Sequence, residues 1–427
     1  MPVAVSATLA ANEALEDRRR AGLPVLPLAF GEAGLNVHPS LERELAAAAG
    51  RGAYGPVAGS AALRGAAAGY WRRRGLRADP DLVVAGPGSK PLLYALLLAI
   101  GGSVVVPRPS WVSYAAQTRL MGTEPIFVAT RPGEGGVPDP DALPEVVARA
   151  RAAGQPVRSV VVTIPDNPTG TLARPETVRR LCEAARALDL IIIADEIYRD
   201  LVFDQGAGFP SPARVAPERT VITTALSKSL ALGGWRIGVA LLPEELSGLR
   251  DRLAAVASEI WSSASGPVQE AAAYAFREPA EIVDRIAASR RLHATVATAV
   301  AERFADAGAR VAMPQGGFYC YPSLDEPAFA DLGDRFGVKT DTDLAEFLLD
   351  EYGVGVLPGS AFGDHPEALR LRVATSLLYG ETHEEREAAL LTPDPLTLPW
   401  IADALERATE VLTDLSSSVR EPVPISA

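Results

Sequence analysis

The sequence predicts an α/β protein, with a large domain built on a mainly parallel sheet between helices and a smaller α+β domain. Short apolar runs of strand length alternate with helical segments between about residues 81 and 241. Unusual polar residues follow the ends of these runs, which is where parallel sheets bind ligands. After about residue 280 a long helical stretch and short strands replace the alternation. We therefore expect an N-terminal arm with part of the small domain at 1–45, the large domain at 46–288 and the small C-terminal domain at 289–427.

The individual elements follow from apolar runs bounded by turn residues. One predicted helix, 176–188, places Val178, Leu181, Cys182 and Ala185 on a single face. Strands of the large sheet are predicted at 82–85, 103–106, 125–128, 159–164, 190–194, 220–223 and 237–241. Further short strands are predicted at 354–357 and 369–374.

Composition excludes several classes of function. The formal charge of −12, with no basic patch, argues against a nucleic-acid partner. No apolar run is long enough to predict a membrane span, and the N-terminus lacks the pattern of a signal peptide. Cys182 and Cys320 are far apart in sequence and predict neither a disulfide framework nor a metal site. We expect a cytoplasmic protein with both thiols reduced and no bound metal.

Lys228 stands in the segment that is most informative about chemistry. It follows Ser227, and a Gly-Gly turn and Arg236 come after it. Only three of the 41 basic residues are lysines, namely Lys90, Lys228 and Lys339. A desolvated amine can lose its proton and form a Schiff base, whereas a guanidinium cannot. The segment therefore suits a lysine that holds an aldehyde cofactor while an arginine holds its phosphate.

Other segments have an ordinary structural interpretation when each is taken alone. The turn at Gly88-Ser89 opens a predicted helix and could bind an anion, although most such turns bind nothing. An aspartate at a strand end, such as Asp195, is commonly a helix cap, and a strand arginine such as Arg370 is commonly part of a surface ion pair. Tyr54, in a segment of small residues, is as compatible with a core position as with a ligand contact.

Taken together and in order, these motifs resemble the class I/II aminotransferases, which are fold-type I enzymes that use pyridoxal 5′-phosphate. The resemblance runs from about Phe30 to Ser376. The motifs that carry it are Pro165-Asp166-Asn167-Pro168-Thr169-Gly170, Ala194-Asp195-Glu196-Ile197-Tyr198, Ser227-Lys228, Gly234-Trp235-Arg236-Ile237-Gly238 and Leu369-Arg370-Leu371.

The resemblance implies a role for each matching residue. Lys228 would form the lysine aldimine and move the proton between the substrate Cα and C4′ of the cofactor. Asp195 would keep the pyridine nitrogen protonated. The remaining cofactor contacts would be Asn167 and Tyr198 at the ring oxygen, Trp111 on the ring face, and Gly88, Ser89, Lys90 and Arg236 at the phosphate. Arg370 would bind the substrate α-carboxylate, with Gly34 and Asn167 also at the substrate, and Tyr54 would reach the phosphate of the other subunit in a homodimer.

The expected reaction moves the amino group of an L-amino acid to a 2-oxo acid. Another pyridoxal phosphate reaction on an amino acid, by a lyase, a decarboxylase or an oxygen-dependent oxidase, would begin with the same residues. A transcription regulator that carries this fold would need a DNA-binding module, for which the first ~28 residues are too few. Three positions depart from the pattern: Ala225 replaces a hydroxyl residue, the loop 31–39 carries His38, and 378–398 is an insertion.

Overall fold

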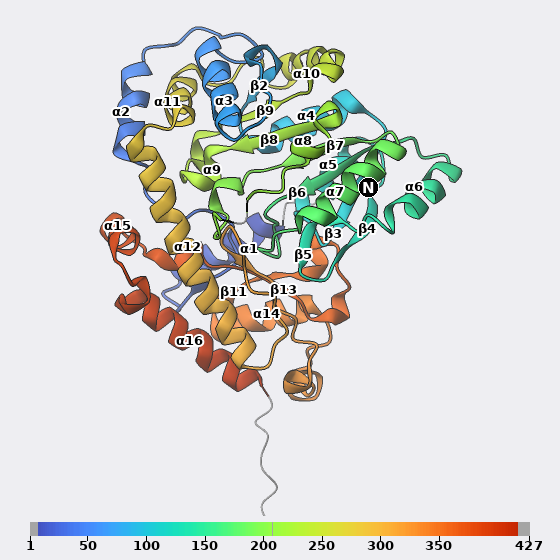
Figure 1. The fold of residues 1–427 in the computed structure, drawn as a ribbon. Helices are drawn as coiled ribbons and strands as arrows, with labels where there is room; N and C mark the ends of the chain where they lie inside the picture. The colour runs from blue at the N-terminus through green and yellow to red at the C-terminus, as the bar shows by residue number, and fades with distance from the viewer. Residues whose placement is uncertain (1–6, 207, 417–427) are drawn as a thin grey trace, which may run out of the picture.

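The computed structural model describes residues 7–206 and 208–416 (Figure 1). The helices are α1 (Ala7–Arg20), α2 (Pro39–Ala48), α3 (Ala61–Arg73), α4 (Ser89–Ile100), α5 (Val112–Leu120), α6 (Leu143–Ala152), α7 (Pro175–Ala187), α8 (Pro212–Val215), α9 (Leu226–Ser229), α10 (Ser247–Ile260), α11 (Gly266–Arg277), α12 (Ala280–Asp306), α13 (Leu332–Phe336), α14 (Asp341–Tyr352), α15 (His383–Leu391) and α16 (Pro399–Leu415). The strands are β1 (Leu26–Pro27), β2 (Val83–Gly86), β3 (Ser103–Arg108), β4 (Ile126–Arg131), β5 (Glu134–Pro138), β6 (Val157–Thr163), β7 (Ile191–Asp195), β8 (Thr220–Ala225), β9 (Gly238–Leu241), β10 (Tyr319–Cys320), β11 (Val354–Gly355), β12 (Leu357–Pro358) and β13 (Leu371–Ala374).

The large sheet has eight strands in the order β2-β9-β8-β7-β6-β3-β4-β5. Strands β8, β7, β6, β3 and β4 run parallel, whereas β9 is antiparallel to both of its neighbours and β5 is antiparallel to β4. Each of the seven strands predicted for this sheet is present, and the α/β fold class is confirmed. The edge strand β5, which contains Gly135 and Gly136, was not predicted.

Alternate residues of the strands face two helical layers, as the near-continuous apolar runs require. On β6, Val161 packs in a cluster with residues of α4 and α5, whereas Val160 and Val162 pack with residues of α6 and α7. Near the other edge, β8 and β9 pack against α4 and α10 on one face and against α3 and α11 on the opposite face. The sheet is therefore buried on both sides.

The smaller α+β unit combines sequence from both ends of the chain. Strand β1 pairs in parallel with β11, and β13 lies between β10 and β12 in an antiparallel sheet. Its core contains residues of α12, α14 and α16, together with Leu26 and Leu28 from the N-terminal segment. In Figure 1 these elements form the lower part of the molecule.

Helix α12 joins the two parts of the molecule. It runs down one side of the structure from the large sheet to the small unit (Figure 1). Its first half contributes Ile282 to the core around α3 and α11, and its second half contributes Val296 and Val300 to the core of the small unit. The predicted domain boundaries, 45/46 and 288/289, fall inside α2 and α12, so the division of the chain stays a prediction and neither boundary lies in a linker.

The insertion at 378–398 contains helix α15 and packs Leu378, Tyr379, Ala389 and Leu390 into the core of the small unit. Helix α15 begins with a capping box in which Thr382 and Glu385 bind each other's backbone N–H groups. The Asn36 side chain donates to the His383 carbonyl at 2.8 Å, so the insertion contacts the loop 31–39. Among the described residues, no helix is both long enough and apolar enough to cross a membrane.

Candidate functional site

A cavity of about 670 Å³ lies where β6, β7 and β8 end and the small unit meets the large sheet. Its walls come from the N-terminal segment, the large sheet and the small unit. The lining residues are Leu9, Phe30, Gly31, Glu32, Ser89, Lys90, Trp111, Tyr114, Thr163, Asn167, Asp195, Ile197, Tyr198, Ser227, Lys228, Gly233, Gly234, Arg236, Tyr319 and Arg372. Most of the residues that the sequence singled out are therefore brought to one place.

Lys228 projects into this cavity from α9, the short helix that directly follows β8. Its ammonium donates to the Gly31 carbonyl. Burial, and then the positive charge of Arg372, lower the pKa of Lys228 to about 8. The neutral amine, which a nucleophile or a proton acceptor requires, is therefore far more accessible near neutral pH than for an ordinary lysine.

Asp195 ends β7 and is 2% exposed. The Tyr114 hydroxyl donates to its Oδ2 at 2.9 Å, and the Thr223 hydroxyl donates to its Oδ1 at 3.3 Å. Burial raises the pKa of Asp195 to about 6 in spite of these two donors. A cation bound opposite would relieve that cost, so the carboxylate suits a protonated ring nitrogen.

The cavity also holds the polar and aromatic groups that the sequence assigned to the ring of a cofactor. Asn167 is 5% exposed and follows β6, and Tyr198 is 3% exposed and follows β7. Trp111 lies at the N-terminus of α5, with its ring 5.2 Å from the centroid of Tyr114. An aromatic face, an amide and a hydroxyl thus surround one region beside Asp195.

A group of positive charges marks the other end of the cavity. Gly88 caps α4 with a φ of 95°, and a Cβ at this position would lie 2.5 Å from the Arg236 guanidinium. Glycine is needed there both for the backbone conformation and for the approach of Arg236. Lys90 and Arg236 both line this end of the cavity, and burial and then the charge of Arg236 lower the pKa of Lys90. With Ser89 and the N-terminus of α4, they form a site for an anion such as a phosphate.

The structure corrects the expectation for the arginine of the small unit. Arg370 does not line the cavity, and its guanidinium instead pairs with Asp364 at 2.8 Å. Arg372, two residues later on β13, lines the cavity and is 1% exposed. It donates to the Ala29 carbonyl and, at 3.4 Å, to Oδ1 of Asn167.

Arg372 has no ion-pair partner among the described residues, and its buried Nε has no hydrogen-bond acceptor there. Burial lowers its pKa from the ordinary value. A buried, unpaired guanidinium is costly unless an anion binds to it. The geometry therefore makes Arg372 a site for a carboxylate that enters the cavity beside Lys228.

Two other predicted site residues lie outside the cavity. Tyr54 is 91% exposed and does not line the cavity of its own chain. Gly34 has a φ of 64°, and a side chain there would collide with the Ser376 carbonyl, so its place is structural. Gly31 and Glu32, three and two residues earlier, line the cavity in its place.

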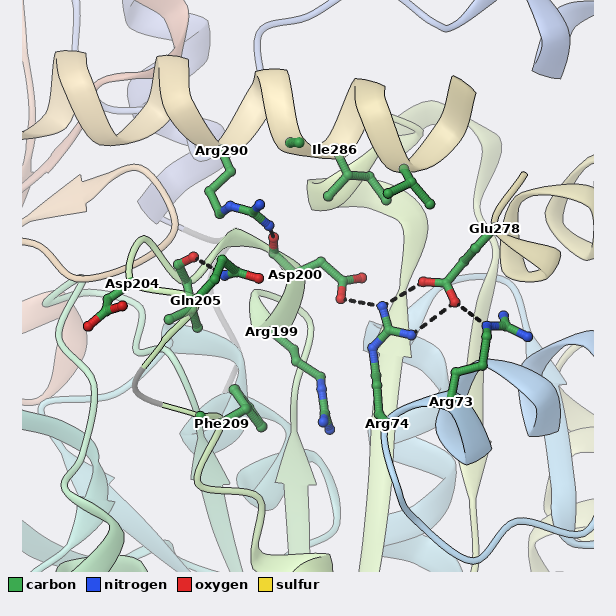
Figure 2. A pocket seen from close by; sticks show the side chains of 14 residues that line it. Arg73, Arg74, Arg199, Asp200, Asp204, Gln205, Phe209, Glu278, Ile286 and Arg290 are labelled. Carbon is green, nitrogen blue, oxygen red and sulfur yellow. Dashed lines mark hydrogen bonds and ion pairs between the residues drawn. The ribbon is translucent and has the colours of Figure 1, made fainter. Parts of the chain in front are cut away.

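A second cavity, of about 390 Å³, lies behind the turn that follows Tyr198 (Figure 2). Arg74 crosses it and pairs with Asp200 at 2.8 Å and with Glu278 at 2.6 Å. Asp200 also accepts a hydrogen bond from the Tyr70 hydroxyl at 3.0 Å. The charged side chains of this cavity thus pair with one another. These pairs link the turn after Tyr198 to the end of α3 and to the end of α11.

Several residues of the main cavity were not predicted. Tyr114 of α5 donates to Asp195, and Thr163 at the end of β6 bonds to the Tyr114 hydroxyl at 2.7 Å. Thr223 of β8 also donates to Asp195, although it does not line the cavity, and Tyr319 and Arg372 come from the small unit. The sequence offered one signal for Tyr114, which comes three residues after Trp111, and one for Arg372, which repeats the arginine two residues earlier. Tyr319 carried no signal.

The residues present fit the cofactor that the resemblance implies. The lysine amine, the buried carboxylate and the cluster of cations match an aldehyde, a pyridine nitrogen and a phosphate in chemical type. Arg236, Lys90 and Arg372 all line the cavity and form no ion pair among the described residues, which favours the binding of anionic groups there.

Comparison with known proteins gives one consistent result. The family described as "Aminotransferase class I and II" matches residues 9–377. A probable aspartate/prephenate aminotransferase of Thermus aquaticus is 34% identical over 363 residues, covering 84% of this chain and 89% of that protein. An aspartate aminotransferase of Geobacillus stearothermophilus is 33% identical over 392 residues, covering 89% and 95%. The structure of the aspartate aminotransferase of Thermus thermophilus with maleate superimposes with a TM-score of 0.79 and 28% identity, covering 96% of this chain and 97% of that one.

Proposed function

The chain belongs to the class I and II aminotransferases, and we propose that Lys228, Asp195 and Arg372 carry its reaction. Membership makes it a pyridoxal-phosphate-dependent enzyme that moves the amino group of an L-amino acid to a 2-oxo acid. The observation that carries the proposal is Arg372, a fully buried and unpaired guanidinium in the same cavity as Lys228. It supplies what every amino acid and every 2-oxo acid needs, a partner for the carboxylate next to the reacting carbon.

The cofactor, when bound, supplies an aldehyde for the lysine amine and a ring that takes up electrons from the substrate Cα. Asp195 keeps a proton on the ring nitrogen, because its buried carboxylate gains a cationic partner there. Tyr114 and Thr223 hold both oxygens of Asp195 in place. Lys90, Ser89 and Arg236, which line one end of the cavity, would bind the phosphate, and the Trp111 ring would cover the cofactor face.

Lys228 performs the proton transfer. Its amine would take the proton from the substrate Cα as a general base and deliver it to C4′ of the cofactor as a general acid, for which a pKa of about 8 is well placed. Arg372 orients the substrate through its carboxylate, and the Asn167 amide that bonds to Arg372 ties this arginine to the cofactor end of the cavity. Tyr198 and Tyr319 exclude water from the same region.

L-aspartate is the first amino donor to test, because the relatives that were identified are described as aspartate aminotransferases. The assay is the half-reaction: the protein is loaded with pyridoxal phosphate, mixed with each amino acid in turn, and followed by absorbance and by release of the 2-oxo acid. We expect Lys228→Ala to lose the wild-type absorbance and to slow the reaction by at least ~10²-fold. Lys339→Ala, which removes an exposed lysine that does not line the cavity, is the matched control. A Lys228→Ala protein that still turned over substrate would falsify the assignment.

A homodimer is part of this proposal. The sequence resemblance gives Tyr54 a contact with the phosphate of the other subunit, and its 91% exposure supports this, because the side chain has almost no contacts within its own chain. The cytoplasm as the location stays a prediction from the composition and the two buried, unpaired cysteines.

A further inference from the structure

Tyr319 lines the cavity, was not predicted from the sequence, and has so far been given no part in the reaction beyond the exclusion of water. It is 1% exposed and lies on β10, where its backbone pairs with Ala374 of β13. A Cβ at Gly31 would collide with the Tyr319 hydroxyl, and a Cβ at Gly170 would collide with the Tyr319 carbonyl oxygen. Two glycines thus accommodate this one tyrosine, which places it with little freedom.

The Tyr319 hydroxyl lies 2.8 Å from the Tyr198 hydroxyl, and the two rings meet edge to face with centroids 5.6 Å apart. The Arg372 guanidinium lies 5.0 Å from the centroid of the Tyr319 ring. Tyr319 therefore contacts both the residue assigned to the cofactor ring oxygen and the residue assigned to the substrate carboxylate.

Each hydroxyl in the pair has one hydrogen, so only one of them donates to the other. If Tyr198 donated to Tyr319, it would have no hydrogen left for the cofactor. If Tyr319 donates, the hydrogen of Tyr198 is free, and the incoming bond makes Tyr198 a stronger donor. No other hydrogen-bond partner of the Tyr319 hydroxyl is found among the described residues, so its hydrogen is available for this purpose.

On this basis, and resting on the proposed function, we propose that Tyr319 is a positioning residue that donates to Tyr198 and thereby directs the Tyr198 hydrogen toward the cofactor ring oxygen. The Arg372 guanidinium on its ring holds Tyr319 in register with the substrate site. The arrangement places one chain of contacts, Arg372 to Tyr319 to Tyr198, along the wall of the cavity.

The test uses the holoenzyme and the pH at which the absorbance of the bound cofactor changes. A hydroxyl that donates to the ring oxygen stabilises negative charge there, so a weaker donor leaves the proton on the chromophore to higher pH. Tyr198→Phe should raise the midpoint by about 1–2 pH units. Tyr319→Phe should raise it by roughly 10–30% of that amount. Tyr321→Phe is the matched control, because Tyr321 lies two residues further along, outside the cavity, and bonds to Asp364 at 2.9 Å.

A double mutant shows whether Tyr319→Phe acts through the Tyr198 hydroxyl or by a general disturbance of the site. In the Tyr198→Phe background, Tyr319→Phe should cause no further shift, since its effect acts through the Tyr198 hydroxyl. A lowered or unchanged midpoint in Tyr319→Phe, or an equal shift in both backgrounds, would overturn the inference. A wild-type protein without any pH-dependent absorbance after loading would instead refute the proposed function, so the two failures are distinguishable.

Discussion

Replacement of the two arginines of the small unit gives the sharpest test of the site. Arg372→Ala removes a guanidinium that is 1% exposed in the cavity, whereas Arg370→Ala removes one that pairs with Asp364 outside it. The two residues differ by only two positions in sequence and carry the same charge. Any difference in activity between the two variants therefore reflects where each arginine lies, inside or outside the cavity.

The structure sets the expected magnitudes. A carboxylate bound to Arg372 forms a charge-assisted, bidentate pair away from water, and losing it costs about 1.5–3 kcal/mol, or roughly 10–150-fold in kcat/KM. The effect should apply to every amino donor, because each carries the α-carboxylate. The Arg370 side chain of the Arg370–Asp364 pair is 32% exposed, so Arg370→Ala should cost about 0.2–1 kcal/mol of stability and change kcat/KM by less than about twofold.

The assay is steady-state kinetics of both variants with at least three amino donors, together with thermal unfolding. Arg372→Lys extends the series, because a lysine keeps the charge and loses the planar fork. Arg372→Ala should not lose stability through a broken ion pair, since Arg372 has none among the described residues. The reasoning is refuted if Arg370→Ala lowers kcat/KM for all donors while Arg372→Ala leaves it near the wild-type value.

Three further predictions concern the phosphate, the subunit contact and stability. Lys90→Ala should weaken pyridoxal phosphate binding by roughly 1.5–3 kcal/mol while Ala225→Ser changes it little, as measured by cofactor titration; tenfold tighter binding by Ala225→Ser with no effect of Lys90→Ala would contradict this. Tyr54→Phe should weaken cofactor binding in a protein that sediments as a dimer, and a fully active monomer at nanomolar concentration would refute the shared site. Burial raises the pKa of Asp166 from 3.8 to about 7. Between pH 3.8 and about pH 7, the folded protein therefore keeps a proton on Asp166 that the unfolded chain has lost. Stability should therefore fall as the pH rises from about 4 to 7, by on the order of 4 kcal/mol for this group, and urea unfolding of Asp166→Asn at pH 5 and pH 8 should show a smaller loss than wild type.

The strands of the large sheet could be predicted because each is a short apolar run that ends at a turn, and burial on both faces makes such runs continuous. Strand β5 could not be predicted in this way. Its Gly135 and Gly136 are small because Thr169, Asp166 and the Thr163 carbonyl lie against them, which is a tertiary contact. Local pattern therefore revealed the central strands and missed an edge strand whose composition is set by its neighbours.

Some residues of the site could likewise be predicted from the sequence, and others could not. Lys228, Asp195 and Asn167 follow the ends of parallel strands, so their meeting at one edge of the sheet follows from the fold class. Arg370 and Arg372 are separated by two residues and would share a face of one strand, so alternation cannot choose between them. In the structure Leu369 has a φ of 43° and β13 begins only at Leu371, so Arg370 lies before the strand and Arg372 lies within it. That conformation is not visible in the sequence.

The placement of the lysines links the composition to the site. Two of the three lysines, Lys90 and Lys228, line the cavity, although the chain uses arginine almost everywhere else. Lys228 needs an amine because its chemistry requires a neutral nitrogen. The same argument extends to Lys90, which lies next to Arg236 where burial and that arginine lower its pKa. A second guanidinium would stay fully charged there before any phosphate bound, whereas burial and Arg236 shift an amine toward its neutral form. Lys90→Arg should therefore leave phosphate affinity nearly unchanged but destabilise the cofactor-free protein, and the comparison of thermal unfolding with and without cofactor measures that difference.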